Sequence, residues 1–150
     1  MRRRDPYVVS ATMRRVRSRD TGPETALRKA LWSRGLRYRV HSKHLPGHPD
    51  IVFPGPRVVV FVDGDFWHGN QWRLRGLTSL EEQFRAAPHA AYWIPKIRRN
   101  MVRDGDATGR LEYDGWRVIR LWESDLKADF ESCVNRVVDE VSSRKGTTQQ

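Results

Sequence analysis

The segment RVVVFVDGDFWHG, residues 57–69, joins a buried strand to a group of acidic, aromatic and histidine residues. Its first half is apolar at almost every position, which is typical of a central strand that is covered on both faces. The strand ends near Asp63, and Phe66, Trp67 and His68 follow within five residues. Loops that a rigid sheet positions are where binding and catalytic residues concentrate. The sequence therefore predicts a functional edge of the sheet directly after this strand.

The segments on either side indicate a mixed α/β chain. Apolar runs or alternation predict strands at residues 36–41, 50–53, 57–62 and 116–122. Helical periodicity predicts helices from Thr21 to Gly35, from Pro95 onward and over 126–143. Strands that are close in sequence, with helices before and after them, imply a mixed central sheet covered on both faces. The expected fold class is α/β, a three-layer α/β/α arrangement.

Local signals place several boundaries. Thr21 and Glu24 have the spacing of a capping box, with a proline in the first helical turn. The tripeptide at 54–56, Pro-Gly-Pro, predicts a turn between two strands. Residues 69–88 show no regular period and are predicted to form a loop. Two glycines at 105 and 109 leave open whether the helix after Pro95 is continuous.

Length and charge restrict the functional classes. A chain of 150 residues is expected to form one domain, here residues 21–144, with a basic arm at 1–20 and a flexible tail at 145–150. The net charge is +10, and 23 of the 28 basic residues are arginine, which favours a nucleic-acid partner. Arginine richness also arises from a GC-rich genome. No apolar run has the length of a membrane span, and the single Cys133 fits a reducing compartment, so we expect a cytoplasmic monomer.

Two carboxylates are expected at the same edge of the sheet. Asp50 starts one strand of the predicted hairpin and Asp63 ends the other. Close carboxylates repel each other unless a cation lies between them, and oxygen ligands suit Mg²⁺. His68 could then take a proton from an attacking water. The alternatives are structural: Asp50 closes a turn, His68 fills a structural position and Glu24 only caps its helix.

The aromatic and polar residues also allow two interpretations each. Phe66 and Trp67 either plug the edge of a core or slide between base pairs as a wedge. Lys96 and Asn100 lie on one face of a helix at i and i+4, where they could bond base edges or simply face solvent.

Taken together, the motifs resemble those of the very short patch repair (Vsr) endonucleases over roughly residues 10–125. The matching motifs are Thr21-x-x-Glu24, LPGHPDIVF (45–53), VVFVDGDFWHG (59–69), Trp93-x-x-Lys96-Ile97-x-x-Asn100-x-x-x-Asp104 and GWRVIRLWE (115–123). The resemblance implies a restriction-endonuclease-like fold. It also implies a Mg²⁺-dependent enzyme that nicks one strand of double-stranded DNA on the 5′ side of the T in a T:G mismatch.

The resemblance further implies roles for individual residues. Asp50 and the backbone carbonyl of Val62 correspond to metal ligands, and Asp63 stands near the metal-bound waters. His68 corresponds to the general base, and Glu24 completes the catalytic group. The positions that correspond to DNA-binding residues are Phe66 and Trp67 (major-groove wedge), Met13 and Val16 (minor-groove arm), and Lys96 and Asn100 (readers of the mispaired bases).

One departure concerns zinc, which some members of the family bind through cysteine and histidine. The matching positions here hold Asp65, Asn70, Trp72 and Ser124, so no structural zinc is expected. Two other functions stay open beside mismatch nicking. One is a restriction-type or modification-dependent nicking enzyme with a different specificity. The other is a basic DNA-binding protein with an inactive site, which the presence of all four catalytic candidates argues against.

Overall fold

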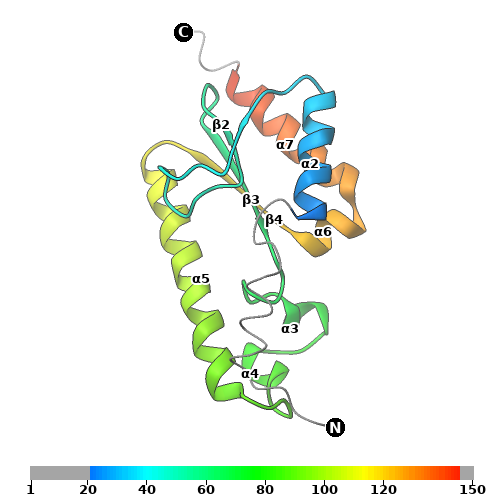
Figure 1. The fold of residues 1–150 in the computed structure, drawn as a ribbon, viewed down its shortest axis with the longest axis vertical. Coiled ribbons are helices and arrows are strands. Elements are labelled where there is room, and N and C mark those ends of the chain that lie inside the picture. Colours follow the sequence, from blue (N-terminus) through cyan, green and yellow to red (C-terminus); the bar gives the residue numbers. More distant parts are fainter. Residues whose placement is uncertain (1–20, 146–150) are drawn as a thin grey trace.

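The computed structural model describes residues 21–145 of the chain, as shown in Figure 1. Residues 1–20 and 146–150 lie outside the described part, and with them the predicted arm residues Met13 and Val16. The division into arm, domain and tail therefore stays a prediction. Within the described residues, no helix is both long enough and apolar enough to cross a membrane.

The core of the fold is a four-stranded sheet in the order β1-β2-β3-β4. The strands are β1 (Arg39–Val40), β2 (Ile51–Phe53), β3 (Val58–Asp63) and β4 (Arg117–Trp122). The first three strands pair antiparallel, and β4 pairs parallel to β3. The predicted mixed sheet and the predicted turn between β2 and β3 are confirmed.

Strand β3 is buried on both faces, as its apolar sequence predicts. Val58 and Val60 pack into a large core with the helices of one layer, whereas Val59 and Phe61 pack into a second core on the opposite face. Because side chains alternate along a strand, a run without polar residues requires an apolar cover on each side. This alternation places β3 in the middle layer of the molecule.

Helices form the two outer layers, as Figure 1 shows. Helices α2 (Gly22–Ser33), α6 (Glu123–Ala128) and α7 (Phe130–Lys145) cover one face of the sheet. Helix α5 (Ala90–Tyr113) covers the other face and extends beyond the sheet toward the short helices α3 (Gln71–Leu74) and α4 (Leu80–Gln83). The predicted three-layer α/β/α arrangement is confirmed.

Three details of the prediction are corrected, and one open question, the continuity of the helix after Pro95, is answered. The predicted strand at 36–41 is only the two exposed residues of β1, and the predicted loop at 69–88 contains α3 and α4. Helix α5 begins at Ala90, so Pro95 lies beyond the first turn. Burial of Trp93 beside Ile97 stabilises this earlier start, and neither Gly105 nor Gly109 interrupts the helix.

The last predicted helix is two helices. Asp129 leaves helical geometry, and its side-chain carboxylate accepts a hydrogen bond from the backbone N–H of Ser132 at 3.2 Å. An aspartate in this position satisfies a free N–H of the next helix and so begins it. The segment predicted as one helix over 126–143 is therefore divided at Asp129.

Candidate active site

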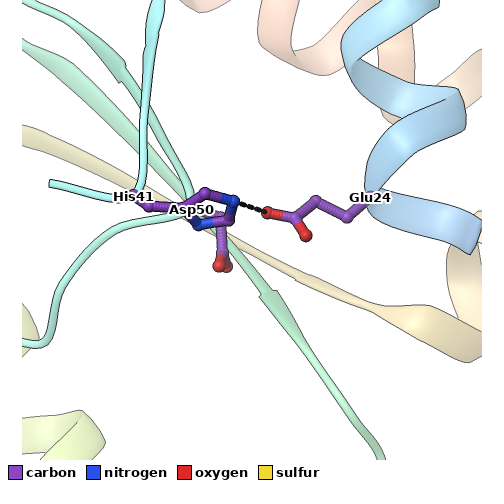
Figure 2. A group of neighbouring side chains, drawn as sticks. All are labelled: Glu24, His41 and Asp50. Atoms are coloured by element: carbon purple, nitrogen blue, oxygen red, sulfur yellow. Dashed lines mark ion pairs between the residues drawn. The ribbon is translucent and has the colours of Figure 1, made fainter. Parts of the chain in front are cut away.

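Three ligand-type side chains meet where α2, β1 and β2 begin or end, as Figure 2 shows. Glu24 comes from the first turn of α2, His41 follows β1 directly, and Asp50 directly precedes β2. One potential ligand atom from each residue lies within 4.8 Å of the others. Glu24 is only 2% exposed, whereas Asp50 and His41 are partly exposed and so reachable from solvent.

The carboxylate of Asp50 is held in a defined orientation. Its Oδ2 accepts a hydrogen bond from the backbone N–H of Val62 at 2.7 Å. Burial raises the pKa of Asp50 to about 7, and the negative charges of Glu24 and Asp63 add to the rise. A cation beside Asp50 and Glu24 would remove this repulsion, so these residues fit a divalent metal ion with oxygen ligands.

The backbone of Val62 faces the same place. The carbonyl of Val60 accepts a hydrogen bond from the N–H of Asp50 at 3.0 Å, and the N–H of Val62 donates to the Asp50 side chain. In an extended strand the N–H and C=O groups of one residue point to the same neighbour, and every second residue repeats that direction. The Val62 carbonyl is therefore directed toward the Asp50 side of β3.

A second group of side chains lies around the end of β3. Asp63 is 5% exposed, and its Oδ1 lies 3.9 Å from Nδ1 of His68. Nδ1 of His68 also lies 2.5 Å from Oδ2 of Asp104, which α5 contributes. Burial lowers the pKa of His68, but the hydrogen bond with Asp104 and the charge of Asp63 outweigh it and leave the pKa raised.

Arg120 of β4 holds this second group together. Its guanidinium donates to both oxygens of Asp63, at 3.3 and 3.0 Å, and to the backbone carbonyl of Asp104 at 3.1 Å. Its Nε donates to the hydroxyl of Thr108 at 2.8 Å. Burial still leaves the pKa of Asp63 raised, although His68 and Arg120 oppose that rise. The arginine thus joins the end of β3 to α5.

One side of α5 contacts the segment that follows β3. Lys96 places its ammonium 5.1 Å from the centre of the Trp67 ring, and Asn100 donates a hydrogen bond to the Trp67 carbonyl at 3.1 Å. Asp104 continues the same i, i+4 row by pairing with His68. Gly69 permits the close approach, because its φ is +77° and a Cβ there would meet the Met101 sulfur at 2.5 Å.

The aromatic residues form a half-buried cluster at this end of α5. Phe66 packs edge-on against Trp67, Phe84 and Trp93, with ring centres 5.4, 6.4 and 5.3 Å apart. Phe66 and Trp67 are partly buried and pack against this core instead of projecting freely. Both rings therefore lie at the edge of the core, as the first interpretation predicts, and part of each ring stays accessible to solvent.

Polar side chains occupy three of the four positions that correspond to zinc ligands in some members of the family, and Trp72 occupies the fourth. Asp65 accepts hydrogen bonds from the side-chain amide of Asn70 at 2.8 Å and from the hydroxyl and backbone N–H of Ser124 at 2.6 and 3.0 Å. Trp72 packs against the aromatic cluster. We call Asp65, Asn70 and Ser124 the polar clasp, because they fasten the segment after β3 to the start of α6.

The structure brings all four predicted catalytic residues to one region, but in two groups. Glu24 and Asp50 belong to the first group, and Asp63 and His68 belong to the second. The Val62 N–H bonds the Asp50 carboxylate, and Asp63 is the next residue after Val62, so the two groups are neighbours. Asp63 faces His68 and Arg120. Asp50 and Asp63 therefore do not flank one shared cation position.

Sequence reasoning missed three residues that complete these groups. His41 follows an alternating basic strand, Arg120 lies inside an apolar strand, and Asp104 appears in the motif without a role. Arg120 offered the clearest signal, because it interrupts an apolar strand of a sheet that helices cover on both faces, where a charged side chain needs a partner.

Comparison with known proteins identifies similar sequences. Residues 3–74 match the family model described as DNA mismatch endonuclease Vsr. A type II nicking enzyme, V.NmeDIP of Neisseria meningitidis serogroup C, is 38% identical over 149 residues, covering 99% of this chain and 96% of that protein. V.XorIIP of Xanthomonas oryzae, also a type II nicking enzyme, is 45% identical over 76% of this chain and 78% of its own length. The DNA mismatch endonuclease Vsr of Escherichia coli K12 is 36% identical over 82% of this chain and 74% of its own length.

Proposed function

Because the chain belongs to the Vsr family of DNA endonucleases, we propose that it nicks one strand of duplex DNA on the 5′ side of the T in a T:G mismatch, with Mg²⁺ as its cofactor. The observation that carries the proposal is the pair of neighbouring groups at the end of β3. One group fits a cation and the other contains a histidine oriented by a carboxylate. The substrate is double-stranded DNA, and the enzyme acts as a monomer.

The first group would hold the metal ion. Asp50 and the Val62 carbonyl are the proposed ligands, and Glu24 places a carboxylate oxygen within 4.8 Å of a carboxylate oxygen of Asp50. When bound, Mg²⁺ supplies a Lewis acid that stabilises negative charge on a phosphate. Asp50 is oriented for this by the Val62 N–H, which occupies one lone pair of Oδ2 and leaves the other oxygen available. No structural zinc is part of the proposal, because the polar clasp fastens the loop.

The second group, around His68, would accept the proton of the attacking water. Asp104 accepts a hydrogen bond from Nδ1–H of His68, which leaves the Nε2 lone pair of a neutral imidazole available. Nε2 can then take the proton of the attacking water. Asp63 and Arg120 form an ion pair that keeps the end of β3 in place beside His68.

The aromatic cluster would provide mismatch selection. In this proposal Phe66 and Trp67 enter the base stack, and the minor-groove arm with Met13 and Val16 enters from the other side. Unstacking one step costs a few kcal/mol. A wobble pair stacks poorly, so opening it costs less than opening a Watson–Crick pair. Lys96 and Asn100 lie beside Trp67 and would read the mispaired bases once the ring has moved.

A second candidate is a restriction-type or modification-dependent nicking enzyme with the same site and another DNA substrate. The similarity to relatives that are named type II nicking enzymes favours this reading. The two candidates share the chemistry of the site and differ in the DNA that the aromatic cluster and the α5 row select.

A nicking assay distinguishes them. Single-turnover nicking is measured on T:G, fully paired and methylated duplexes over a library of flanking sequences, with Mg²⁺ and with EDTA. We expect nicking only with Mg²⁺ and mainly on T:G duplexes. Asp50→Ala should abolish nicking and retain duplex binding, whereas the exposed control Asp139→Ala should retain both. Equal nicking of paired or methylated DNA would favour the second candidate, and full activity of Asp50→Ala would contradict the metal assignment.

A further inference from the structure

We propose that His41 supplies a nitrogen ligand to the divalent cation that Glu24 and Asp50 bind, which makes the centre a mixed nitrogen–oxygen site with an increased preference for Mn²⁺ over Mg²⁺. The inference deepens the proposed function and rests on it only for the presence of a cation at Asp50. It concerns the composition of the metal centre and does not depend on which DNA is cut.

The pairing of the first two strands places His41 opposite Asp50. Val40 pairs with Ile51 in the antiparallel register, so the next pair along the chain is His41 with Asp50. The N–H of His41 donates to the carbonyl of Asp50 at 3.1 Å, which continues the ladder beyond β1. His41 itself leaves the extended conformation, with φ +50°, and its ligand atom lies within 4.8 Å of one from Asp50. His41 and Asp50 are therefore fixed as neighbours by the backbone.

The distances within the group suit a cation. Nε2 of His41 lies 3.8 Å from Oε1 of Glu24, and Figure 2 shows the imidazole pointing toward the Glu24 carboxylate. Ligands about 2.1 Å from an octahedral ion lie about 3 Å apart when adjacent and about 4 Å apart when opposite. The observed separation falls between these values, so small side-chain movements would complete the coordination.

Arg28 also contacts the nitrogen that would bind the cation. A guanidinium nitrogen of Arg28 lies 3.4 Å from Nε2 of His41. Arginine has only donors, so a hydrogen bond between these atoms requires Nε2 without a proton. An imidazole with a free lone pair on Nε2 is also the form that coordinates metals. Cation binding would exchange the Arg28 contact for a coordinate bond at the same atom.

The donor set predicts a shift in metal preference. Oxygen ligands suit Mg²⁺ and Mn²⁺ alike, whereas an imidazole favours transition-metal ions over Mg²⁺. Replacing His41 with glutamine keeps a side chain of similar size but removes the aromatic nitrogen. We expect His41→Gln to weaken Mn²⁺ binding by about tenfold and Mg²⁺ binding by much less.

The test is electron spin-echo spectroscopy of the full chain loaded with Mn²⁺, without DNA. A directly coordinated histidine gives a ¹⁴N coupling on the Mn²⁺ signal. We expect this coupling in the unaltered protein, its loss in His41→Gln and its retention in the matched control His68→Gln. The control matters because Asp63, His68 and Asp104 form the other group of potential ligands in the described part of the chain.

Three results would overturn the inference: absence of Mn²⁺ binding, bound Mn²⁺ without nitrogen coupling, and coupling that disappears in His68→Gln instead of His41→Gln. If His41→Gln does not fold, by circular dichroism, the unaltered chain still tests the idea. The ring protons of His41 should then broaden before those of His68 in an NMR titration with Mn²⁺, and the reverse order would contradict it. Nicking of T:G duplexes, measured separately, tells failure of the proposed function apart from failure of the histidine ligand.

Discussion

His68 and Asp104 are 36 residues apart in the sequence, and their Nδ1 and Oδ2 atoms lie 2.5 Å apart. One residue belongs to the segment after β3 and the other to α5, so the contact forms only when the helix has packed across the sheet. The pair orients the imidazole and raises its pKa. This relationship leads to a prediction about rate and pH.

Asp104→Asn should lower the single-turnover nicking rate by about 100-fold or more, because the imidazole loses the carboxylate that fixes its tautomer. A base must be neutral to act, so the rate rises as pH increases through the pKa of His68. Loss of the negative charge lowers that pKa and moves the acidic limb of the pH–rate profile to lower pH. Asp106→Asn, two residues further along α5 and exposed, is the control. An unchanged pH–rate profile in Asp104→Asn would mean that Asp104 has only a structural role.

Arg120→Met should lower the free energy of unfolding by about 3 kcal/mol, because it leaves the nearly buried carboxylate of Asp63 without its cation. Adding Asp63→Asn to the same chain should recover part of that loss. Urea unfolding of the two single variants and the double variant gives the coupling energy. Simple addition of the two losses would mean that the ion pair contributes nothing specific.

Asp65→Ala should destabilise the protein by roughly 1–3 kcal/mol, because three donors of the polar clasp lose their acceptor. The variant should also increase hydrogen exchange at the backbone N–H of Asn70, which bonds the Asp65 carbonyl. Exposed Asp139→Ala is a matched control. Metal analysis of the purified protein should find no stoichiometric zinc. One equivalent of tightly bound zinc would contradict the idea that the polar clasp alone holds the segment after β3 to α6.

Asp50→Asn should stabilise the metal-free protein at pH 8 by roughly 1–3 kcal/mol. Folding raises the pKa of Asp50 from its ordinary 3.8 to about 7, so the folded state retains a proton that the unfolded chain releases between these values. The raised pKa therefore adds to the free energy of unfolding in full below about pH 4, and this contribution is lost as the pH rises through about 7. Urea unfolding from pH 4 to 8 in EDTA should show a flatter dependence in the variant. An equally steep decline in both proteins would refute the assignment to Asp50.

Phe66→Ala combined with Trp67→Ala should remove the preference for T:G over paired duplexes and leave slow nicking of both. The half-buried rings also contribute to the core, so folding is checked by circular dichroism. Tyr113→Ala is the control, because that aromatic ring is 92% exposed and lies at the other end of α5. Preserved T:G preference in the double variant would return both rings to a purely structural role.

The parts of the fold that were predictable depend on local sequence. Thr21 caps α2 by accepting a hydrogen bond from the N–H of Glu24, as the capping-box spacing predicts. Strand β3 follows from its apolar run, and the turn at 54–56 follows from its prolines and glycine. These features depend on interactions within a few residues, which a sequence pattern contains.

The parts that were not predictable depend on long-range packing. The partners of Arg120 were not predictable, because α5 brings Thr108 and Asp104 to β4 only when the helix packs against the sheet. His41 becomes a neighbour of Glu24 only through the pairing of β1 with β2 and the packing of α2. The candidate site was therefore predictable at its strand ends and not in the partners that other elements bring to it.

The uninterrupted course of α5 has a geometric consequence. Lys96, Asn100 and Asp104 repeat every four residues on one helix, so they stand about 6 Å apart along a rigid axis. In the proposed mechanism, the helix sets the distance between Lys96 and Asn100, which would read the bases, and Asp104, which would orient His68. Adding a single residue between Asn100 and Asp104 would rotate one end against the other by about 100°. If the proposed roles hold, the pitch of α5 would set the spacing between the recognised base and the phosphodiester bond that is cut.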